Sequence, residues 1–228
     1  MFFGFRNCKD DAVHFCHAKN TWDDSDNGQM DPERGPLILP CLHRYAYHPE
    51  PNMKLRPVCL DEIKRVMRQR AVSVDLIPEV EDECLDNLAS FCFDKTEKGE
   101  EMQCLQDNLE KLTEKCKTAV INYTEEEAGH IELNPVIMSY CRSAMEKHCD
   151  TVLRTGKDEG DMMECLISHK NDPEMRQDLK CRAAVEHFQL TSLKNYHFTY
   201  KFKEACRPHV MRFCPSSNTK YDVVACLR

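Results

Sequence analysis

Apolar residues recur at helical spacing around four pairs of cysteines whose members stand eight residues apart. The pairs are Cys8 and Cys16, Cys84 and Cys92, Cys141 and Cys149, and Cys206 and Cys214. The fourth residue after the first cysteine and the residue before the second are mostly apolar; they are Ala12, Leu88, Met145 and Val210, and Phe15, Phe91, His148 and Phe213. Because these positions share one face of a helix, each pair predicts an amphipathic helix.

Two residues modify this pattern. His148 stands where the other copies have phenylalanine, and we interpret it as a half-buried packing residue and not as a ligand. Pro208 follows Cys206 by two residues and favours a helix that starts there, because proline disrupts a helix interior.

A longer amphipathic helix is predicted to begin at each of Cys59, Cys116 and Cys181. The residues four and seven positions further on are apolar, which again makes one helix face; they are Ile63, Val66, Val120, Tyr123, Val185 and Phe188. Each helix is predicted to break ten residues after the second of its two apolar positions, as at Leu133-Asn134-Pro135, ten residues after Tyr123.

A Cys-Leu dipeptide marks a short helix in every copy. The dipeptides are Cys41-Leu42, Cys104-Leu105, Cys165-Leu166 and Cys226-Leu227. In the third copy, Asn171-Asp172-Pro173 is predicted to end the helix, because the residue before a proline avoids the α conformation.

The cysteines therefore define a repeat with a first, second, third and fourth cysteine. We predict repeats at residues 1–59, 60–116 and 117–181 and a truncated one at 182–228, which lacks the fourth cysteine. Variable loops separate second from third cysteines, and the first of them, Thr21 to Pro40, is long and acidic. The fold class is predicted to be all-α: an elongated array of tandem helical hairpins, stapled by disulfides, in which each contacts its neighbours.

Composition narrows the class of protein. The chain has 15 cysteines and no CxxC pair, which indicates a disulfide framework in an oxidising compartment. The net charge is −8, and no basic block suggests nucleic acid. No apolar run reaches the length of a membrane span, and no signal peptide precedes the repeats, so we expect the chain to be part of a longer protein.

Helix geometry limits how these cysteines can pair. Two cysteines eight apart on a helix lie ~12 Å apart along its axis, too far for a disulfide. If the chain folds back at each break, the fourth cysteine faces the second cysteine of the next repeat. We therefore favour the pairs Cys59–Cys92, Cys116–Cys149, Cys181–Cys214, Cys8–Cys41, Cys84–Cys104, Cys141–Cys165 and Cys206–Cys226, with Cys16 unpaired. The alternative is a nested scheme within each repeat, first to fourth and second to third.

With its repeats laid out, the chain resembles the Golgi apparatus protein 1 family, also described as cysteine-rich fibroblast growth factor receptors and E-selectin ligands. The cysteine spacing carries the resemblance, together with the strings Glu62 to Leu76, Glu101 to Leu112, Asp161 to Ile167 and Tyr200 to Cys206. It covers essentially the whole chain.

The resemblance implies a non-enzymatic binding scaffold on the lumenal side of the Golgi membrane or at the cell surface, within a membrane-anchored glycoprotein. It implies fibroblast growth factors, latent transforming growth factor complexes and, through glycans, selectins as partners. No contact residue for these partners can be assigned from the motif. A secretory thiol-disulfide enzyme and a purely structural Golgi protein are the alternative functions.

Few residues suggest chemistry beyond the framework. Asn122-Tyr123-Thr124 is the only N-glycosylation sequon, on a predicted helix. His43 and His48 are five apart, and we expect no metal site there and no cofactor elsewhere. Glu125-Glu126-Glu127 is interpreted as a solvated helix face, and no catalytic motif is present.

Overall fold

The structure, a computed structural model, describes residues 5–18, 38–46, 48, 50–77, 79–155 and 158–228. Within these ranges it contains fourteen α-helices, six 3-10 helices (η) and no strand, which confirms the all-α class. The chain divides into two compact units, residues 1–70 and 71–228. Most of the acidic loop predicted between Thr21 and Pro40 lies outside the described residues.

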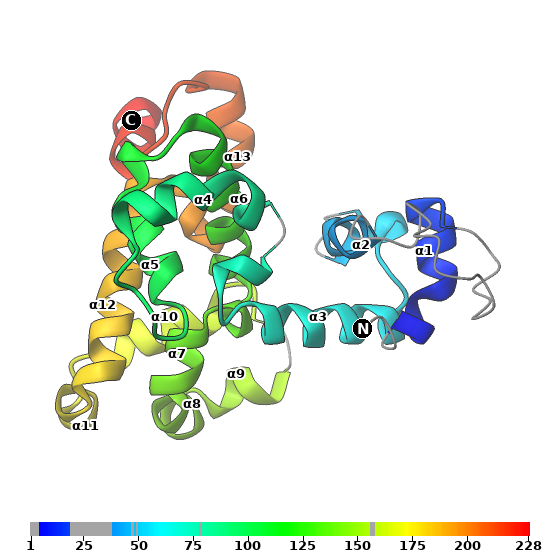
Figure 1. Ribbon diagram of the computed structural model, residues 1–228. Coiled ribbons are helices and arrows are strands. Elements are labelled where there is room, and N and C mark those ends of the chain that lie inside the picture. Colours follow the sequence, from blue (N-terminus) through cyan, green and yellow to red (C-terminus); the bar gives the residue numbers. More distant parts are fainter. Residues whose placement is uncertain (1–4, 19–37, 47, 49, 78, 156–157) are drawn as a thin grey trace. The chain divides into compact units, whose positions relative to one another are not determined.

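The first unit holds repeat one (Figure 1). Its helices are η1 (Phe5–Cys8), α1 (Lys9–Cys16), α2 (Ile38–Ala46), η2 (Pro51–Met53) and α3 (Pro57–Arg70). Helix α2 packs against both α1 and α3, and its Leu42 is fully buried with Ala12 and Ile63. The buried carboxylate of Asp11 accepts hydrogen bonds from the backbone N–H and Nε of Arg56, both at 2.9 Å.

The second unit holds repeats two to four. Its helices are η3 (Val74–Leu76), α4 (Val80–Phe91), α5 (Glu100–Asp107), η4 (Leu109–Lys111), α6 (Glu114–Gly129), η5 (Ile131–Leu133), α7 (Pro135–Tyr140), α8 (Arg142–His148), α9 (Asp150–Thr155), α10 (Asp161–His169), α11 (Pro173–Gln177), α12 (Leu179–Lys194), η6 (Tyr196–Phe198), α13 (Tyr200–Phe213) and α14 (Lys220–Leu227). Helix α4 packs beside α6, and α7 beside α12 (Figure 1).

The apolar stripes predicted from spacing form the cores of the repeats. Ile63, Val120 and Val185, each four residues after a fourth cysteine, are fully buried. So are the leucines of the first three Cys-Leu dipeptides, whereas Leu227 in repeat four is 38% exposed. The predicted breaks also occur: α6 ends at Gly129, and α7 begins at Pro135 after Asn134 caps it with its side chain.

Proline 208 does not start a helix, as its position in the sequence had suggested. Helix α13 runs without interruption from Tyr200 to Phe213 with Pro208 inside it. The corresponding helix is instead divided in repeat three, where Cys141 separates α7 from α8.

The disulfides follow the nested scheme, so the pairing favoured from the sequence is wrong. First cysteines bond to fourth cysteines of the same repeat, and second to third. The seven bonds are Cys8–Cys59, Cys16–Cys41, Cys84–Cys116, Cys92–Cys104, Cys141–Cys181, Cys149–Cys165 and Cys214–Cys226. Cys206, and not Cys16, has no disulfide partner.

The error has a physical cause in the way the helices pair. Equal distance from a break brings two cysteines together only if the flanking helices pack on each other. Here the stripe of α6 that contains Cys116 and Val120 faces α4 of its own repeat, where the Cα atoms of Cys84 and Cys116 are 4.7 Å apart. The outer bonds of the other two complete repeats have nearly the same Cα separation, 4.6 and 4.8 Å.

The repeats of the second unit are also joined by contacts between helices of different repeats. Lys194 of α12 donates hydrogen bonds from Nζ to the carbonyl oxygens of Gln106 and Asp107 at the end of α5, over 2.8 and 3.1 Å. Helix α6, which begins at the end of repeat two and runs into repeat three, also contacts α13 of repeat four. Among the described residues, no helix combines the length and the apolarity that crossing a membrane requires.

Candidate functional site

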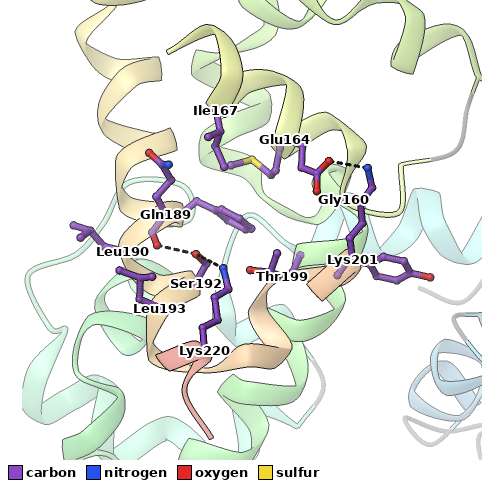
Figure 2. A pocket seen from close by; sticks show the side chains of 14 residues that line it. Gly160, Glu164, Ile167, Gln189, Leu190, Ser192, Leu193, Thr199, Lys201 and Lys220 are labelled. Carbon is purple, nitrogen blue, oxygen red and sulfur yellow. Dashed lines mark hydrogen bonds and ion pairs between the residues drawn. The ribbon is translucent and has the colours of Figure 1, made fainter. Parts of the chain in front are cut away.

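A cavity of about 330 Å³ lies where α10 and α12 meet the start of α13 (Figure 2). Its walls are largely apolar, because α12 and α10 direct Phe188, Leu193 and Ile167 toward it. Polar groups come from Ser192, Thr199, Lys201 and Lys220. The cavity therefore combines an apolar body with a few polar groups, as small-molecule sites do.

The two lysines of the cavity have different surroundings. Lys201 is neutralised by Asp161 and Glu164, whose oxygens lie 2.5 and 2.7 Å from its Nζ and raise its pKa. Lys220 instead donates a hydrogen bond to Ser192 Oγ over 3.3 Å and forms no ion pair with any described residue. Burial lowers its pKa.

The hydroxyl of Thr199 adds a second polar group to this end of the cavity. Its Oγ1 is buried and makes no hydrogen bond with the described residues. Together with the ammonium group of Lys220 (Figure 2), it suits a small ligand that has an apolar body and one anionic or hydrogen-bonding group. Glu164 is held by Lys201, so the lining offers no free carboxylate as a general base.

The glutamates at 125–127 are not the solvated helix face that the sequence suggested. Glu125 is half-buried and accepts hydrogen bonds from His197 Nδ1 at 2.9 Å and Lys203 Nζ at 3.1 Å. Burial alone would raise the pKa of Glu125, but these two partners lower it below its ordinary value. This cluster connects α6 to η6 and α13, so it stabilises the contact of α6 with repeat four.

Glu127 is buried completely on the other side of the same helix. Its Oε2 accepts a hydrogen bond from Gln106 Nε2 at 2.8 Å, and the same amide also donates to Thr124 Oγ1 at 3.1 Å. Burial raises the pKa of Glu127 to about 7. Glu125 and Glu127 therefore have different environments although they are close in the sequence, because neighbouring residues on a helix point in different directions.

The sequon residue Asn122 lies in α6 with its side chain exposed. Tyr123 is buried beside it, and its hydroxyl donates to the carbonyl oxygen of Leu133 at 2.9 Å. An exposed Asn122 leaves room for a glycan, and its glycosylation stays a prediction. His43 lies in α2, and His48 follows it and accepts a hydrogen bond from the backbone N–H of Glu50.

Comparison with known proteins identifies the repeat. A family model described as "Cysteine rich repeat" (Cys_rich_FGFR) matches residues 57–113, 114–174 and 179–228. Golgi apparatus protein 1 from chicken (Gallus gallus) and from human (Homo sapiens) is 38% identical over 98% of this chain. The homolog from Caenorhabditis elegans is 35% identical over 98% of the chain.

The chain belongs to the Golgi apparatus protein 1 family. It spans about a fifth of the length of these curated relatives, 18% to 20% of each. The names of the relatives support a Golgi location, and none of them names an enzymatic activity. No solved structure matches the chain significantly.

The disulfides of this Golgi apparatus protein 1 family member cross the limits of the matched segments. The segment 114–174 contains Cys116 and Cys141, but Cys116 bonds to Cys84 in the preceding segment and Cys141 to Cys181 in the following one. Successive family segments are therefore linked covalently. Each family segment begins at a fourth-cysteine helix, which completes the repeat before it.

The structure also brings together residues that sequence reasoning missed. His148, His169 and Asp172 form the only group of three or more potential metal-ligating side chains among the described residues. A signal was present: His148 interrupts the phenylalanine column, and His169 follows a third cysteine by the same four residues as Tyr45. Both histidines replace aromatic residues of the repeat, but only the packing of α8 on α10 makes the two positions neighbours.

Proposed function

We propose that this chain is part of a lumenal, non-enzymatic binding scaffold in a membrane-anchored Golgi glycoprotein. Its partners are secreted proteins, with fibroblast growth factors as the first class and latent transforming growth factor complexes as the second. The observation that carries the proposal is the succession of three matches to the Cys_rich_FGFR repeat. The partners rest on family resemblance, and no contact residue is assigned by it.

The framework supports a scaffold role because its disulfides hold the surface helices in fixed positions. Fourteen cysteines form seven disulfides. Each of the three complete repeats contains two of these bonds, and repeat four contains one. Each bond contributes about 2–4 kcal/mol by restricting the unfolded chain. A ligand therefore meets a preorganised surface, which lowers the entropy lost on binding.

The net charge of −8 supports a basic partner. Helix α4 offers one acidic face that can be tested, because Glu81, Asp82 and Asp86 are all exposed on it. Leu85, 66% exposed, lies among them. Acidic residues around an apolar side chain are suited to a basic protein surface that carries its own apolar contact.

Surface plasmon resonance tests this proposal. The oxidised chain is immobilised, and a basic fibroblast growth factor is injected at several salt concentrations, with lysozyme as a basic protein of unrelated structure. We expect saturable growth-factor binding that weakens with salt and is reduced by Glu81→Lys/Asp82→Lys, and no comparable lysozyme binding. Equal binding of the growth factor and lysozyme would show that the interaction depends on charge alone, and it would contradict a growth-factor scaffold.

A thiol-disulfide enzyme remains the alternative because Cys206 is outside the disulfide framework. An insulin-reduction assay distinguishes the two functions. A scaffold gives turnover at the background rate, and Cys206→Ser leaves it unchanged. Turnover above background that is lost in Cys206→Ser would contradict the scaffold proposal and support a thiol-disulfide enzyme.

Selectin binding is proposed to depend on a glycan, and Asn122 is its candidate position in this chain. Protein secreted from eukaryotic cells is compared before and after enzymatic removal of N-glycans in the same binding experiment, with E-selectin as the injected protein. Loss of binding supports the glycan route. Binding that survives both deglycosylation and Asn122→Gln would place selectin recognition on the protein surface.

A further inference from the structure

We propose that repeat three contains a binding site for a divalent transition metal ion of the Zn²⁺ class, with His148, His169 and Asp172 as ligands. The site lies where the ends of α8 and α10 meet the start of α11. It goes beyond the proposed scaffold function and does not depend on it.

Three ligand atoms converge at this position. Asp172 Oδ2 lies 2.8 Å from His169 Nδ1 and 3.8 Å from His148 Nδ1. All three potential ligand atoms lie within 4.8 Å of one another. Ligand atoms around a tetrahedral Zn²⁺ are roughly 3.3 Å apart for bonds of about 2.0 Å, so modest side-chain rotations bring this group to the metal.

The surrounding structure holds the backbone of each ligand. His148 is followed directly by Cys149, which is bonded to Cys165 on α10, four residues before His169. Asp172 precedes Pro173 at the start of α11, and its backbone N–H donates to the carbonyl oxygen of His169 at 2.9 Å. A disulfide and a proline therefore restrain the backbone positions that carry the three ligands.

Repeat one has a pair of stacked rings at the positions that correspond to His148 and His169, but these rings have no nitrogen that could bind a metal. There Phe15 and Tyr45 stack with centroids 4.6 Å apart and planes at 26°. In repeat three His148 and His169 stack in the same way, at 4.8 Å and 25°. The packing is thus retained while both rings become imidazoles, and Asp172 stands beside them.

Packing alone does not account for this arrangement. A stacked aromatic pair fills the space equally well, as repeat one demonstrates, and needs no carboxylate. Two imidazole nitrogens and a carboxylate oxygen are a ligand set of the type that Zn²⁺ takes, with a fourth position left for water. The side chains of His169 and Asp172 are 39% and 42% exposed, so an ion reaches them from solvent.

A second carboxylate lies beside the site. Glu174 Oε2 is 4.0 Å from His148 Nε2 and pairs with Lys147. It faces the ring nitrogen of His148 that is not directed at Asp172. A carboxylate on the outer nitrogen orients a metal-bound imidazole and increases its basicity, so Glu174 is proposed as a positioning residue.

The test uses the full oxidised chain, freed of metals with a chelator and titrated with ZnCl₂ by isothermal titration calorimetry. We expect one Zn²⁺ per chain, no binding of Mg²⁺, and weaker binding at acidic pH, because protons compete for the imidazoles. In parallel, side-chain ¹H–¹⁵N spectra should show Zn²⁺ shifting the imidazole resonances of His148 and His169 and leaving that of His209 unchanged.

The chain itself supplies the matched variant. His148→Phe/His169→Tyr rebuilds the stacked pair of repeat one, so it should fold with an unchanged melting temperature and lose Zn²⁺ affinity by at least about tenfold, since even outer-shell changes cost 10–100-fold. Asp172→Asn should also weaken binding and serves as the second variant should the first not fold. His209→Gln, at an exposed position of α13, should bind as the parent does.

Two results would overturn the proposal. The first is absence of Zn²⁺ binding by the parent chain at micromolar to millimolar metal, which would leave the histidines as a packing pair. The second is equal affinity in the parent, in His148→Phe/His169→Tyr and in Asp172→Asn, which would place the metal elsewhere.

Discussion

The side chains of Gln106 and Glu127 form a buried hydrogen bond of 2.8 Å, in which the Gln106 amide donates to the Glu127 carboxyl group. Both residues are about 4% exposed. The bond joins α5 to α6 inside the second unit. No lysine or arginine contributes to the raised pKa of Glu127; burial is its cause, and the hydrogen bond from Gln106 opposes it.

Stability is therefore expected to depend on pH through Glu127. Its pKa rises from 4.5 to about 7 on folding, so the folded chain holds this proton more tightly than the unfolded chain. The stabilising contribution is complete below pH 4.5 and is lost as the pH rises through 7, up to about 3 kcal/mol. Glu127→Gln should remove that part of the pH dependence, measured by urea unfolding at pH 5 and pH 8. Glu114→Gln, at the exposed start of the same helix, should retain it.

The nested disulfides predict a definite peptide map. Proteolysis without reduction should yield Cys84 linked to Cys116 and Cys141 linked to Cys181, and only Cys206 should react with iodoacetamide before reduction. Replacing Cys84 and Cys116 by alanine should lower the free energy of unfolding by about 2–4 kcal/mol. A peptide that links Cys116 to Cys149 would contradict the nested scheme.

A close approach of two helices makes Gly129 sensitive to substitution. A Cβ atom at Gly129 would lie 2.7 Å from Tyr200 Cδ2 on α13. Gly129→Ala should therefore destabilise the second unit by about 1–3 kcal/mol. In a double-mutant cycle measured by chemical unfolding, the same change should cost much less when Tyr200 is alanine. An equal cost in both backgrounds would show that the close approach is not the cause.

The cavity beside Lys220 is expected to take a small apolar anion. Anilinonaphthalene sulfonate, a fluorescent probe with an apolar body and one sulfonate, should bind to the folded chain. Lys220→Met should weaken this binding by about tenfold, since it removes a partly buried charge worth over 1 kcal/mol to an anion. Lys201→Met is the control, because Lys201 is already neutralised by Asp161 and Glu164. Equal weakening by both variants would indicate nonspecific charge attraction.

Glycosylation of Asn122 is expected in protein secreted from eukaryotic cells. Its side chain is exposed on α6, whereas the sequon threonine, Thr124, is buried and bonded to Gln106. The acceptor must therefore be modified before α6 packs. Mass spectrometry should find a glycan on Asn122 that Asn122→Gln removes, and a secreted chain without this mass would exclude the site.

Sequence and structure contributed differently to the functional residues. Regular spacing made the framework cysteines and the Asn122 sequon visible in the sequence. The cavity was not visible, because its lining comes from α10, α12 and repeat four, which no local pattern relates. His148 was noticed and interpreted as packing, since His169 and Asp172 become its neighbours only when α8 and α10 are joined.

The sequence by itself determined most of the helices, the breaks after the fourth-cysteine helices and the positions that those helices bury. Ile63, Val120 and Val185 could be assigned to the core because a helix places residues i, i+4 and i+7 on one face whatever it packs against. Tertiary structure decided which faces meet. The stripe that includes Cys116 and Val120 could have packed across the break or against α4, and spacing fits both. Only the packing of α4 on α6 brings Cys84 within disulfide distance of Cys116, because pairing depends on contacts between helices and not on periodicity within one.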